Sequence, residues 1–354
     1  MNVLFTKNFS VTAAQLHALH GSRYSVWASH SDPGHGMLAA ADHTFLEPRG
    51  LLGDDYAAWL LDACIQHGIQ LVIPGKEREL LASWQERFAA AGITLITPAT
   101  EAVQRHLERK DEFLRGWDTD ILPLPRWTTF DSLQSFDDAV AQLRVPGVRL
   151  CVKPARGIYA SGFRVLMDTP DLKSFLGGEL YQMSTAAARE LFAQAAPQGT
   201  PGELPTMLLM HTLEGAERSV DCVAWQGELL RAVVRRKGGE GQQIEDRPDL
   251  LEAARQISAR YNLSGIFNFQ TKDGPDAPGP DTQGRNRRAN MLEINARASG
   301  GLRYSMAAGV NFPLLLLDAA TGVLDRATIP PVQTGLRVAE DKVARVIRGQ
   351  EATA

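Results

Sequence analysis

The first hundred residues alternate between short apolar runs and stretches in which apolar positions have helical spacing. The apolar runs predict strands at residues 2–6, 24–29, 69–73 and 93–96. The helical spacing predicts helices at residues 11–20, 54–67 and 77–91. Asp54 is the expected N-cap of the second helix, and Gly68 is its expected C-terminal stop. Strict alternation of strand and helix predicts a parallel sheet with right-handed crossovers, so we expect residues 1–97 to form a small Rossmann-like domain.

The turn after the first strand argues against a dinucleotide site. Residues 7–12 contain no glycine, whereas a Rossmann phosphate loop needs the pattern G-x-G-x-x-G. Ligands of open α/β sheets bind at the carboxyl ends of the strands, where the polar side chains are Asn8, Ser10, His30, Asp32, Lys76 and Glu77. A second group has the composition of a metal site: His30, Asp32, His35, Asp42 and His43. Its spacing matches no defined zinc pattern, and a polar loop explains it equally well.

A lysine leaves an apolar strand in the middle of the chain. Residues 148–154 predict a buried strand with Lys153 near its end, and a loop of small residues follows with Gly157, Ser161 and Gly162. A point charge beside a backbone that a ligand can approach closely is suited to phosphate capture. The order of residues is not that of a Walker A loop, and a structural hairpin turn is the alternative.

The next part of the chain predicts strands at residues 207–213, 217–225 and 266–271, with a helix at residues 248–261. Residues 235–241 hold Arg235, Arg236 and Lys237 beside glycines. We expect a flexible basic loop here that closes over phosphates, and a solvated run of charges is the alternative.

Residues 290–297 predict one strand with two different faces. Side chains alternate across a strand, so Glu293, Asn295 and Arg297 share one face while Leu292 and Ile294 lie on the other. Carboxylate and amide oxygens suit a hard cation such as Mg²⁺, and a guanidinium suits an anion. An edge strand whose polar face meets water is the alternative.

The bulk composition narrows the class of protein. The chain has 354 residues, of which 44% are hydrophobic and 22% charged, as is typical of globular proteins with two or three domains. Its formal net charge of -4 gives no electrostatic footprint for nucleic acid, so we expect no such partner. Cys64, Cys151 and Cys222 are widely spaced in apolar stretches and predict free core thiols. The apolar runs are too short for a signal peptide or a membrane span, so we expect a cytoplasmic protein without a membrane partner.

Taken in order, these motifs resemble the ATP-grasp superfamily of ligases, most closely its carbamoyl-phosphate-synthase-like branch of carboxylate–amine ligases. That branch has a strand reading Asn-x-Gln and, after a hairpin, Glu-x-Asn-x-Arg; this chain has Asn268-Phe269-Gln270 and the second pattern at residues 293–297. The resemblance covers residues 98–322 and implies an α/β chain, in which a Rossmann-like pre-ATP-grasp domain precedes a two-subdomain, α+β ATP-grasp fold. We expect a first domain at residues 1–97, a lid subdomain at 98–206, a subdomain with the metal site at 207–333, and a tail at 334–354.

The resemblance also implies roles for individual residues. It implies that Gln270, Glu293 and Asn295 hold Mg²⁺, with Mn²⁺ as the alternative, although relatives commonly have a second carboxylate where Gln270 stands. Arg297 would contact the transferring phosphate and Lys153 the α- and β-phosphates, and these two are the expected catalytic residues. The other expected contacts to ATP come from Lys110, Gly157, Ser161, Gly162, Met210, His211, Leu213, Glu217 and Lys237. Among these, residues 210–213 would face adenine and Glu217 the ribose hydroxyls.

The implied reaction joins a small-molecule carboxylate to an amine. ATP would phosphorylate the carboxylate, and the amine would then attack the acyl phosphate, with release of ADP and phosphate. One alternative is phosphorylation of a carboxylate or bicarbonate, as in carbamoyl phosphate synthesis. Another is a catalytically inactive, nucleotide-binding regulatory protein. A homodimer through the first domain is common among relatives.

Overall fold

The computed structural model describes residues 1–8, 10–157, 162–168, 181–196, 198, 200–274 and 288–340. These residues form two compact units. The first consists of Met1–Arg105, Glu217–Gln270 and Ile294–Ala354, and the second of His106–Ala216 and Thr271–Glu293. The predicted domain boundaries at residues 97, 206 and 333 stay a prediction.

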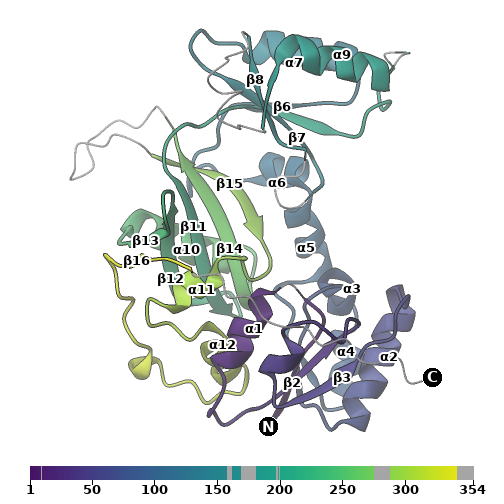
Figure 1. Cartoon of the computed structure of the whole chain (residues 1–354), viewed down its shortest axis with the longest axis vertical. Helices are drawn as coiled ribbons and strands as arrows, with labels where there is room; N and C mark the ends of the chain where they lie inside the picture. The colour runs from purple at the N-terminus through teal and green to yellow at the C-terminus, as the bar shows by residue number, and fades with distance from the viewer. Residues whose placement is uncertain are drawn as a thin grey trace. The chain divides into compact units, whose positions relative to one another are not determined.

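The first unit begins with a five-stranded parallel sheet (Figure 1). Its strands, in the spatial order β3-β2-β1-β4-β5, are β1 (Asn2–Phe5), β2 (Ser25–His30), β3 (His43–Leu46), β4 (Leu71–Ile73) and β5 (Thr94–Leu95). The helices of this part are α1 (Val11–His17), η1 (Leu38–Ala40), α2 (Gly53–Gln66), α3 (Arg78–Ala82) and α4 (Gln85–Ala90). All neighbouring strands run parallel, which confirms the predicted Rossmann-like arrangement.

Details of this sheet differ from the prediction. Strand β3 was not predicted, and the helix predicted at residues 77–91 is divided into α3 and α4. The prediction of Asp54 as an N-cap is wrong, because Leu52 occupies that position and Asp54 lies in the first turn. The Asp54 carboxylate instead accepts a hydrogen bond of 2.9 Å from Trp84 Nε1. Gly68 follows α2 in the left-handed region, with φ of 62°, as expected for a helix stop.

A second sheet of six strands has the order β15-β14-β11-β12-β13-β16. The strands are β11 (Glu217–Trp225), β12 (Glu228–Lys237), β13 (Gln242–Glu245), β14 (Gly265–Asp273), β15 (Ala289–Asn295) and β16 (Arg337–Val338). The helical segments that accompany it are α10 (Pro248–Arg260), α11 (Leu302–Met306), α12 (Phe312–Ala320) and η2 (Arg326–Thr328). The pairing of β12 with β11 and β13 is antiparallel.

Within the first unit, one hydrophobic core joins the parallel sheet to the part of the six-stranded sheet that this unit contains. It combines side chains of the parallel sheet, such as Val3 and Phe5, with others from β11, β12 and α12, such as Val233 and Phe312. Polar contacts reinforce it: Asn311 Nδ2 donates to the Ala18 carbonyl at 2.6 Å, and Tyr24 Oη donates to Asp318 Oδ1 at 2.8 Å. Burial raises the pKa of Tyr24 to about 12, so this phenol remains a donor at neutral pH.

The second unit contains a five-stranded sheet with the order β6-β10-β7-β8-β9. Its strands are β6 (Trp127–Phe130), β7 (Leu150–Pro154), β8 (Arg164–Met167), β9 (Gln182–Ser184) and β10 (Met207–His211). Helices α6 (Lys110–Gly116), α7 (Leu133–Leu143) and α9 (Thr185–Ala195) belong to this unit, and α5 (Glu101–Glu108) spans the boundary at residue 105. Phe130, Phe136 and Phe192 pack edge to face at centroid distances of 5.0–5.2 Å in its core.

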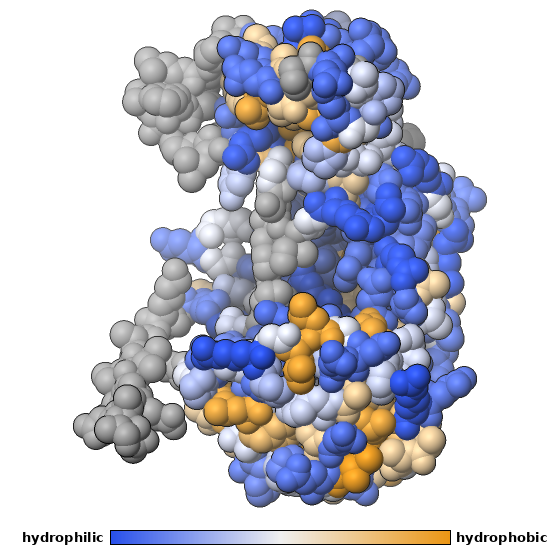
Figure 2. All heavy atoms as spheres, turned by 90° about the vertical axis from the view of Figure 1, so that its right-hand side faces the viewer, coloured by the Kyte–Doolittle hydropathy of each residue, from blue (hydrophilic) through white to orange (hydrophobic). Residues whose placement is uncertain are grey.

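On the face drawn in Figure 2, the described residues are mostly hydrophilic, with separate apolar patches. Among the described residues, the large apolar side chains that remain exposed are Met1, Leu46, Leu52, Ile65, Tyr181, Leu191 and Val323. Within the described ranges, none of the helices has both the length and the apolar character needed to cross a membrane. Cys64, Cys151 and Cys222 are buried free thiols, which confirms the prediction, and burial raises the pKa of all three.

Candidate functional site

Strand β15 carries two of the three predicted metal ligands, and the third, Gln270, lies on β14. Glu293 and Asn295 are half-buried and, two residues apart on one strand, lie on the same face. The strand ends at Asn295, so the prediction that it continues to Arg297 is wrong. The Arg297 side chain nevertheless contacts the end of the strand, because its Nη2 donates to Asn295 Oδ1 at 3.2 Å. Its Nη1 donates to the Ala298 carbonyl at 3.3 Å.

Lys153 lies near the end of β7, in the second unit with Glu293. Burial lowers the pKa of Lys153, the negative charge of Glu293 opposes this shift, and the positive charge of Lys110 adds to it. Two predicted phosphate lysines and one predicted metal ligand therefore interact electrostatically within this unit. A carboxylate and two cations in one electrostatic group suit a ligand that has phosphate oxygens and a metal ion.

The backbone after β7 is held by Lys110. Lys110 N donates to the Ala155 carbonyl at 3.0 Å, and Lys110 Nζ donates to the Gly157 carbonyl at 2.5 Å. Gly162 has φ of 74°, and a Cβ there would lie 2.7 Å from Pro154 Cδ. A side chain at position 162 would therefore be strained and would clash. Ser161, the other predicted contact in this loop, lies outside the described residues.

The predicted adenine contacts lie on or just after β10. This strand pairs with β7, with Leu208 opposite Lys153, so the predicted adenine and phosphate segments are neighbours in one sheet. Met210 and Leu213 are buried. The His211 ring is hydrogen bonded through Nε2 to the Leu143 carbonyl at 2.8 Å, so its backbone, rather than its ring, is the part suited to contact a nucleotide.

Three further predicted residues meet in the first unit. Lys237 Nζ lies 2.5 Å from Glu217 Oε1 and 3.4 Å from Gln270 Oε1. They come from the end of β12, the start of β11 and the length of β14, respectively. The structure thus joins the predicted ribose contact, a predicted phosphate contact and a predicted metal ligand in one polar cluster.

The expected flexible loop at residues 235–241 is partly wrong. Arg235, Arg236 and Lys237 are the last residues of β12, where Arg235 pairs with Ser219 and Lys237 pairs with Gln242. The basic run forms strand because both of its neighbours offer backbone partners, and only the glycine-rich segment after it forms a turn.

Arg235 anchors a buried polar network that the sequence analysis did not anticipate. Its side chain is 2% exposed, and its Nε donates to Asp221 Oδ2 at 2.7 Å. Its Nη2 donates to Ser219 Oγ and Ser299 Oγ, each at 3.0 Å, and a Cβ at Gly301 would lie 2.6 Å from its Nη1. The sequence pattern that indicates this network is the alternation of Ser219 and Asp221 with apolar residues, because it places both polar side chains on one face of β11.

The donor chemistry of the predicted metal ligands fits Mg²⁺. Glu293 offers a carboxylate, and Gln270 and Asn295 offer amide oxygens, which are the hard ligands that this ion prefers. The part of the chain that the structure describes contains no group of three or more His, Cys, Asp or Glu arranged to hold a metal. His30 and His35, from the alternative metal group, instead stack with ring centroids 3.9 Å apart.

Comparisons with known proteins bear on the fold. Residues 203–344 match the model of a family described as ATP-grasp in the biosynthetic pathway with Ter operon. No curated protein has a sequence that matches this chain.

Solved structures match over almost the whole chain. The ADP complex of N5-carboxyaminoimidazole ribonucleotide synthetase has a TM-score of 0.62 and 12% identity, over 95% of this chain and 79% of that one. An L-amino acid ligase from Bacillus licheniformis has a TM-score of 0.59 and 13% identity, over 93% and 77%. The biotin carboxylase domain of the 2-oxoglutarate carboxylase from Hydrogenobacter thermophilus, with MgADP and bicarbonate, has a TM-score of 0.58 and 15% identity, over 91% and 69%. These similarities confirm the predicted fold class.

Proposed function

We propose that this chain, which has the ATP-grasp fold and matches an ATP-grasp family model over residues 203–344, is an ATP-dependent ligase that joins a carboxylate to an amine. The structural relatives support this proposal, because their names describe a synthetase, an amino acid ligase and a carboxylase. Two of them were solved with ADP or MgADP. Magnesium and ATP are the cofactor and the nucleotide that we assign to this chain.

The observation that carries the proposal is the interaction of Glu293 with Lys153. In the second unit, the charge of Glu293 acts on a lysine whose pKa burial has lowered. On the same strand face, Asn295 offers an amide oxygen beside the Arg297 guanidinium. A carboxylate that acts on a lysine, in the second unit, and an amide oxygen beside an arginine, in the first, are the kinds of group that phosphoryl transfer requires, because its catalysis is chiefly positioning and neutralisation of charge.

Each candidate residue has a defined task in this proposal. Glu293, Asn295 and Gln270 would hold Mg²⁺, which when bound supplies Lewis-acid polarisation of phosphate oxygens. Lys153 and Lys110 neutralise phosphate charge, and Glu217 accepts hydrogen bonds from the ribose. Arg297 holds the phosphoryl group or the carboxylate that receives it.

The proposed reaction has two steps. A carboxylate oxygen of the first substrate attacks the γ-phosphorus of ATP, which forms an acyl phosphate and releases ADP. The nitrogen of the amine then attacks the acyl carbon, so that the amide forms and phosphate leaves, and the proton lost by the amine passes to solvent or to phosphate. The protein needs no covalent nucleophile of its own, but it must exclude water from the acyl phosphate.

The test is the substitution Glu293→Gln, which removes the negative charge and keeps the shape. We expect the wild type to bind ATP in calorimetric titrations with Mg²⁺ and to lose affinity with EDTA. It should release ADP with a member of a panel of carboxylates, including bicarbonate, and amines. Glu293→Gln should lower that turnover by about 100-fold or more, because Mg²⁺ would lose its charged ligand.

The matched control is Glu252→Gln on the exposed face of α10, which should leave ADP release unchanged. Absence of magnesium-dependent ATP binding in the wild type would refute the proposal. Equal turnover in Glu293→Gln and wild type would show that Glu293 does not take part in the reaction.

A further inference from the structure

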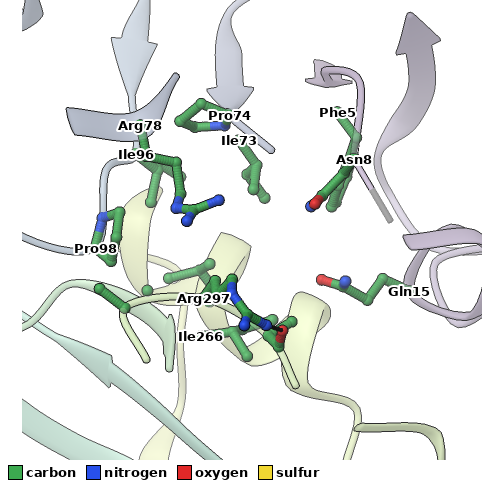
Figure 3. A pocket seen from close by; sticks show the side chains of 14 residues that line it. Phe5, Asn8, Gln15, Ile73, Pro74, Arg78, Ile96, Pro98, Ile266 and Arg297 are labelled. Carbon is green, nitrogen blue, oxygen red and sulfur yellow. Dashed lines mark hydrogen bonds between the residues drawn. The ribbon is translucent and has the colours of Figure 1, made fainter. Parts of the chain in front are cut away.

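A small pocket lies within the first unit, at the carboxyl ends of β1 and β4 (Figure 3). One side is formed by residues that end or follow these strands, including Phe5, Asn8 and Arg78. The other side is formed by the segment Ala296 to Ala298, which follows β15. Its free volume of about 40 Å³ accommodates a small polar group and not a whole nucleotide.

The charged groups that line this pocket are both positive, and its other polar groups are neutral amides. Arg78, Asn8, Gln15 and Arg297 direct their side chains toward the cavity from different sides (Figure 3). Among the described residues that line it, none carries a carboxylate, and the others are apolar or small. Two guanidinium groups in a mainly apolar pocket favour an anion, since attraction between charges is stronger where water is scarce.

The loop that presents Arg78 is fixed by its own contacts. Gly75 N donates to Thr6 Oγ1 at 3.0 Å, and a Cβ at Gly75 would lie 2.4 Å from the Lys7 carbonyl oxygen. Glu77 has φ of 56°, a conformation that is strained for a residue with a side chain. The Arg78 guanidinium also donates to the Gly75 carbonyl. Arg78 is therefore held in place before any ligand arrives.

Arg297 connects this pocket to the proposed catalytic strand. Its Nη2 donates to Asn295 Oδ1 at 3.2 Å, and Asn295 is a proposed ligand of the metal. An anion held by Arg297 and Arg78 therefore lies close to Asn295, a proposed ligand of the metal ion that we expect to act on the γ-phosphate.

We propose that Arg78 is a specificity-determining residue: its guanidinium, which lines the same pocket as that of Arg297, binds the carboxylate of the substrate that becomes phosphorylated. The fork of a guanidinium matches the two oxygens of a planar carboxylate, and the small volume suits that group better than a tetrahedral phosphate. Binding of a carboxylate follows from the pocket alone. Its identity as the phosphoryl acceptor rests on the proposed function.

The experiment uses acetate as the probe and acetamide as its uncharged analogue. Each is titrated into the full-length protein, and affinity is measured by calorimetry and by the shift in melting temperature. We expect wild type to bind acetate and not acetamide. Arg78→Met should weaken acetate binding about 10- to 100-fold, the usual effect of losing a hydrogen bond to a charged group. The acetate affinity of Arg78→Lys should lie between those of wild type and Arg78→Met, because lysine keeps the positive charge but lacks the paired N–H donors of the guanidinium.

The matched control is Arg87→Met on α4. Arg87 is exposed and stacks on Trp84, and its loss should leave acetate binding unchanged. Should Arg78→Met fail to fold, the acetate affinity of Arg78→Lys decides, because that variant keeps the positive charge.

Three results would overturn the inference: no response of wild type to acetate, equal binding of acetate and acetamide, or acetate affinity that Arg78 substitutions do not change. Tighter binding of inorganic phosphate than of acetate, with the same dependence on Arg78, would also overturn it in favour of a phosphate pocket. Titration with MgATP separates the two proposals. Loss of the acetate response with normal MgATP binding refutes only the pocket, whereas acetate binding without MgATP binding refutes the proposed function.

Discussion

Lys153 is a basic side chain in surroundings that disfavour its charge. It lies near the end of an apolar strand, and burial lowers its pKa despite the nearby charge of Glu293. In the free protein the protonated amine is therefore a source of instability. A group with that property is typical of functional sites, where a ligand supplies the missing counter-charge.

We predict that Lys153→Met leaves the melting temperature unchanged or higher and lowers ATP-dependent turnover by about 100-fold or more. The folded pKa lies below the usual 10.5, so the unfolded chain binds this proton more tightly. The wild-type free energy of unfolding should then rise with pH from the folded pKa up to the unfolded one, and this rise should be smaller in Lys153→Met. Thermal unfolding across alkaline pH measures both effects. The exposed Arg189→Met on α9 is the control, and a large drop in melting temperature for Lys153→Met would contradict the argument.

Sequence reasoning located Lys153 and Glu293 but did not single out Arg78. The first two stand in motifs whose order along the chain is informative by itself. Arg78 is a candidate only because it lines the same pocket as Arg297, which is more than two hundred positions away in the sequence. No local pattern predicts this proximity. Asn8 was expected in the same crevice, because the ends of parallel strands converge there.

At the scale of elements, strands β11 and β12 are joined by a buried ion pair as well as by backbone hydrogen bonds. Arg235 and Asp221 are both buried, and the serines at positions 219, 299 and 305 complete their hydrogen bonding. The sequence showed a basic run and was interpreted as a loop. The register that sets Ser219 opposite Arg235 depends on long-range pairing, which the local pattern does not contain.

We predict that Asp221→Leu destabilises the protein by about 3–5 kcal/mol, because it leaves the Arg235 charge buried without its partner. The double variant Asp221→Leu, Arg235→Met should lose less stability than the single one, since no unpaired charge remains. Urea denaturation of the three proteins measures the difference. Arg255→Met, which removes an exposed arginine of α10, is the control and should change stability little. A double variant less stable than Asp221→Leu would show that the network matters for more than charge pairing.

At the scale of the whole molecule, the parallel sheet and the six-stranded sheet share a core. Phe5 and Leu16 belong to the same cluster as Val233, Phe312 and Leu316. Hydrogen bonds such as that from Ser264 N to the Pro98 carbonyl, at 2.8 Å, join the same two parts. The first hundred residues are therefore part of the packing of residues far along the chain.

We predict that a fragment lacking residues 1–97 does not fold on its own. Its removal would expose the apolar face of β12, α11 and α12 that this core covers, and large exposed apolar surfaces favour aggregation. Circular dichroism and thermal unfolding of the fragment, beside the full chain under the same conditions, provide the measurement. A soluble fragment with a cooperative transition close to that of the full chain would show that the two parts are independent.

The sequence predicted much of the architecture, because strict alternation of strand and helix permits few topologies. It missed β3, where His43, Thr44 and Leu46 are exposed and offer no regular alternation of burial. It also could not predict the shared core, since the apolar positions of Phe5 or Phe312 indicate burial without indicating the partner. The order of motifs predicted the ATP-grasp fold, whereas the roles of the individual site residues stay a prediction.

The three buried cysteines have a practical consequence. Cys64 lies in α2 and packs against the parallel sheet, Cys151 lies in β7 and Cys222 lies in β11, so each thiol lies in or against a different sheet. Because all three thiols are buried, and burial also raises the pKa of each, an alkylating reagent reacts with a cysteine only after the surrounding region has opened. The order in which the three are labelled in the native chain would therefore rank its sheets by local stability, without any introduced probe.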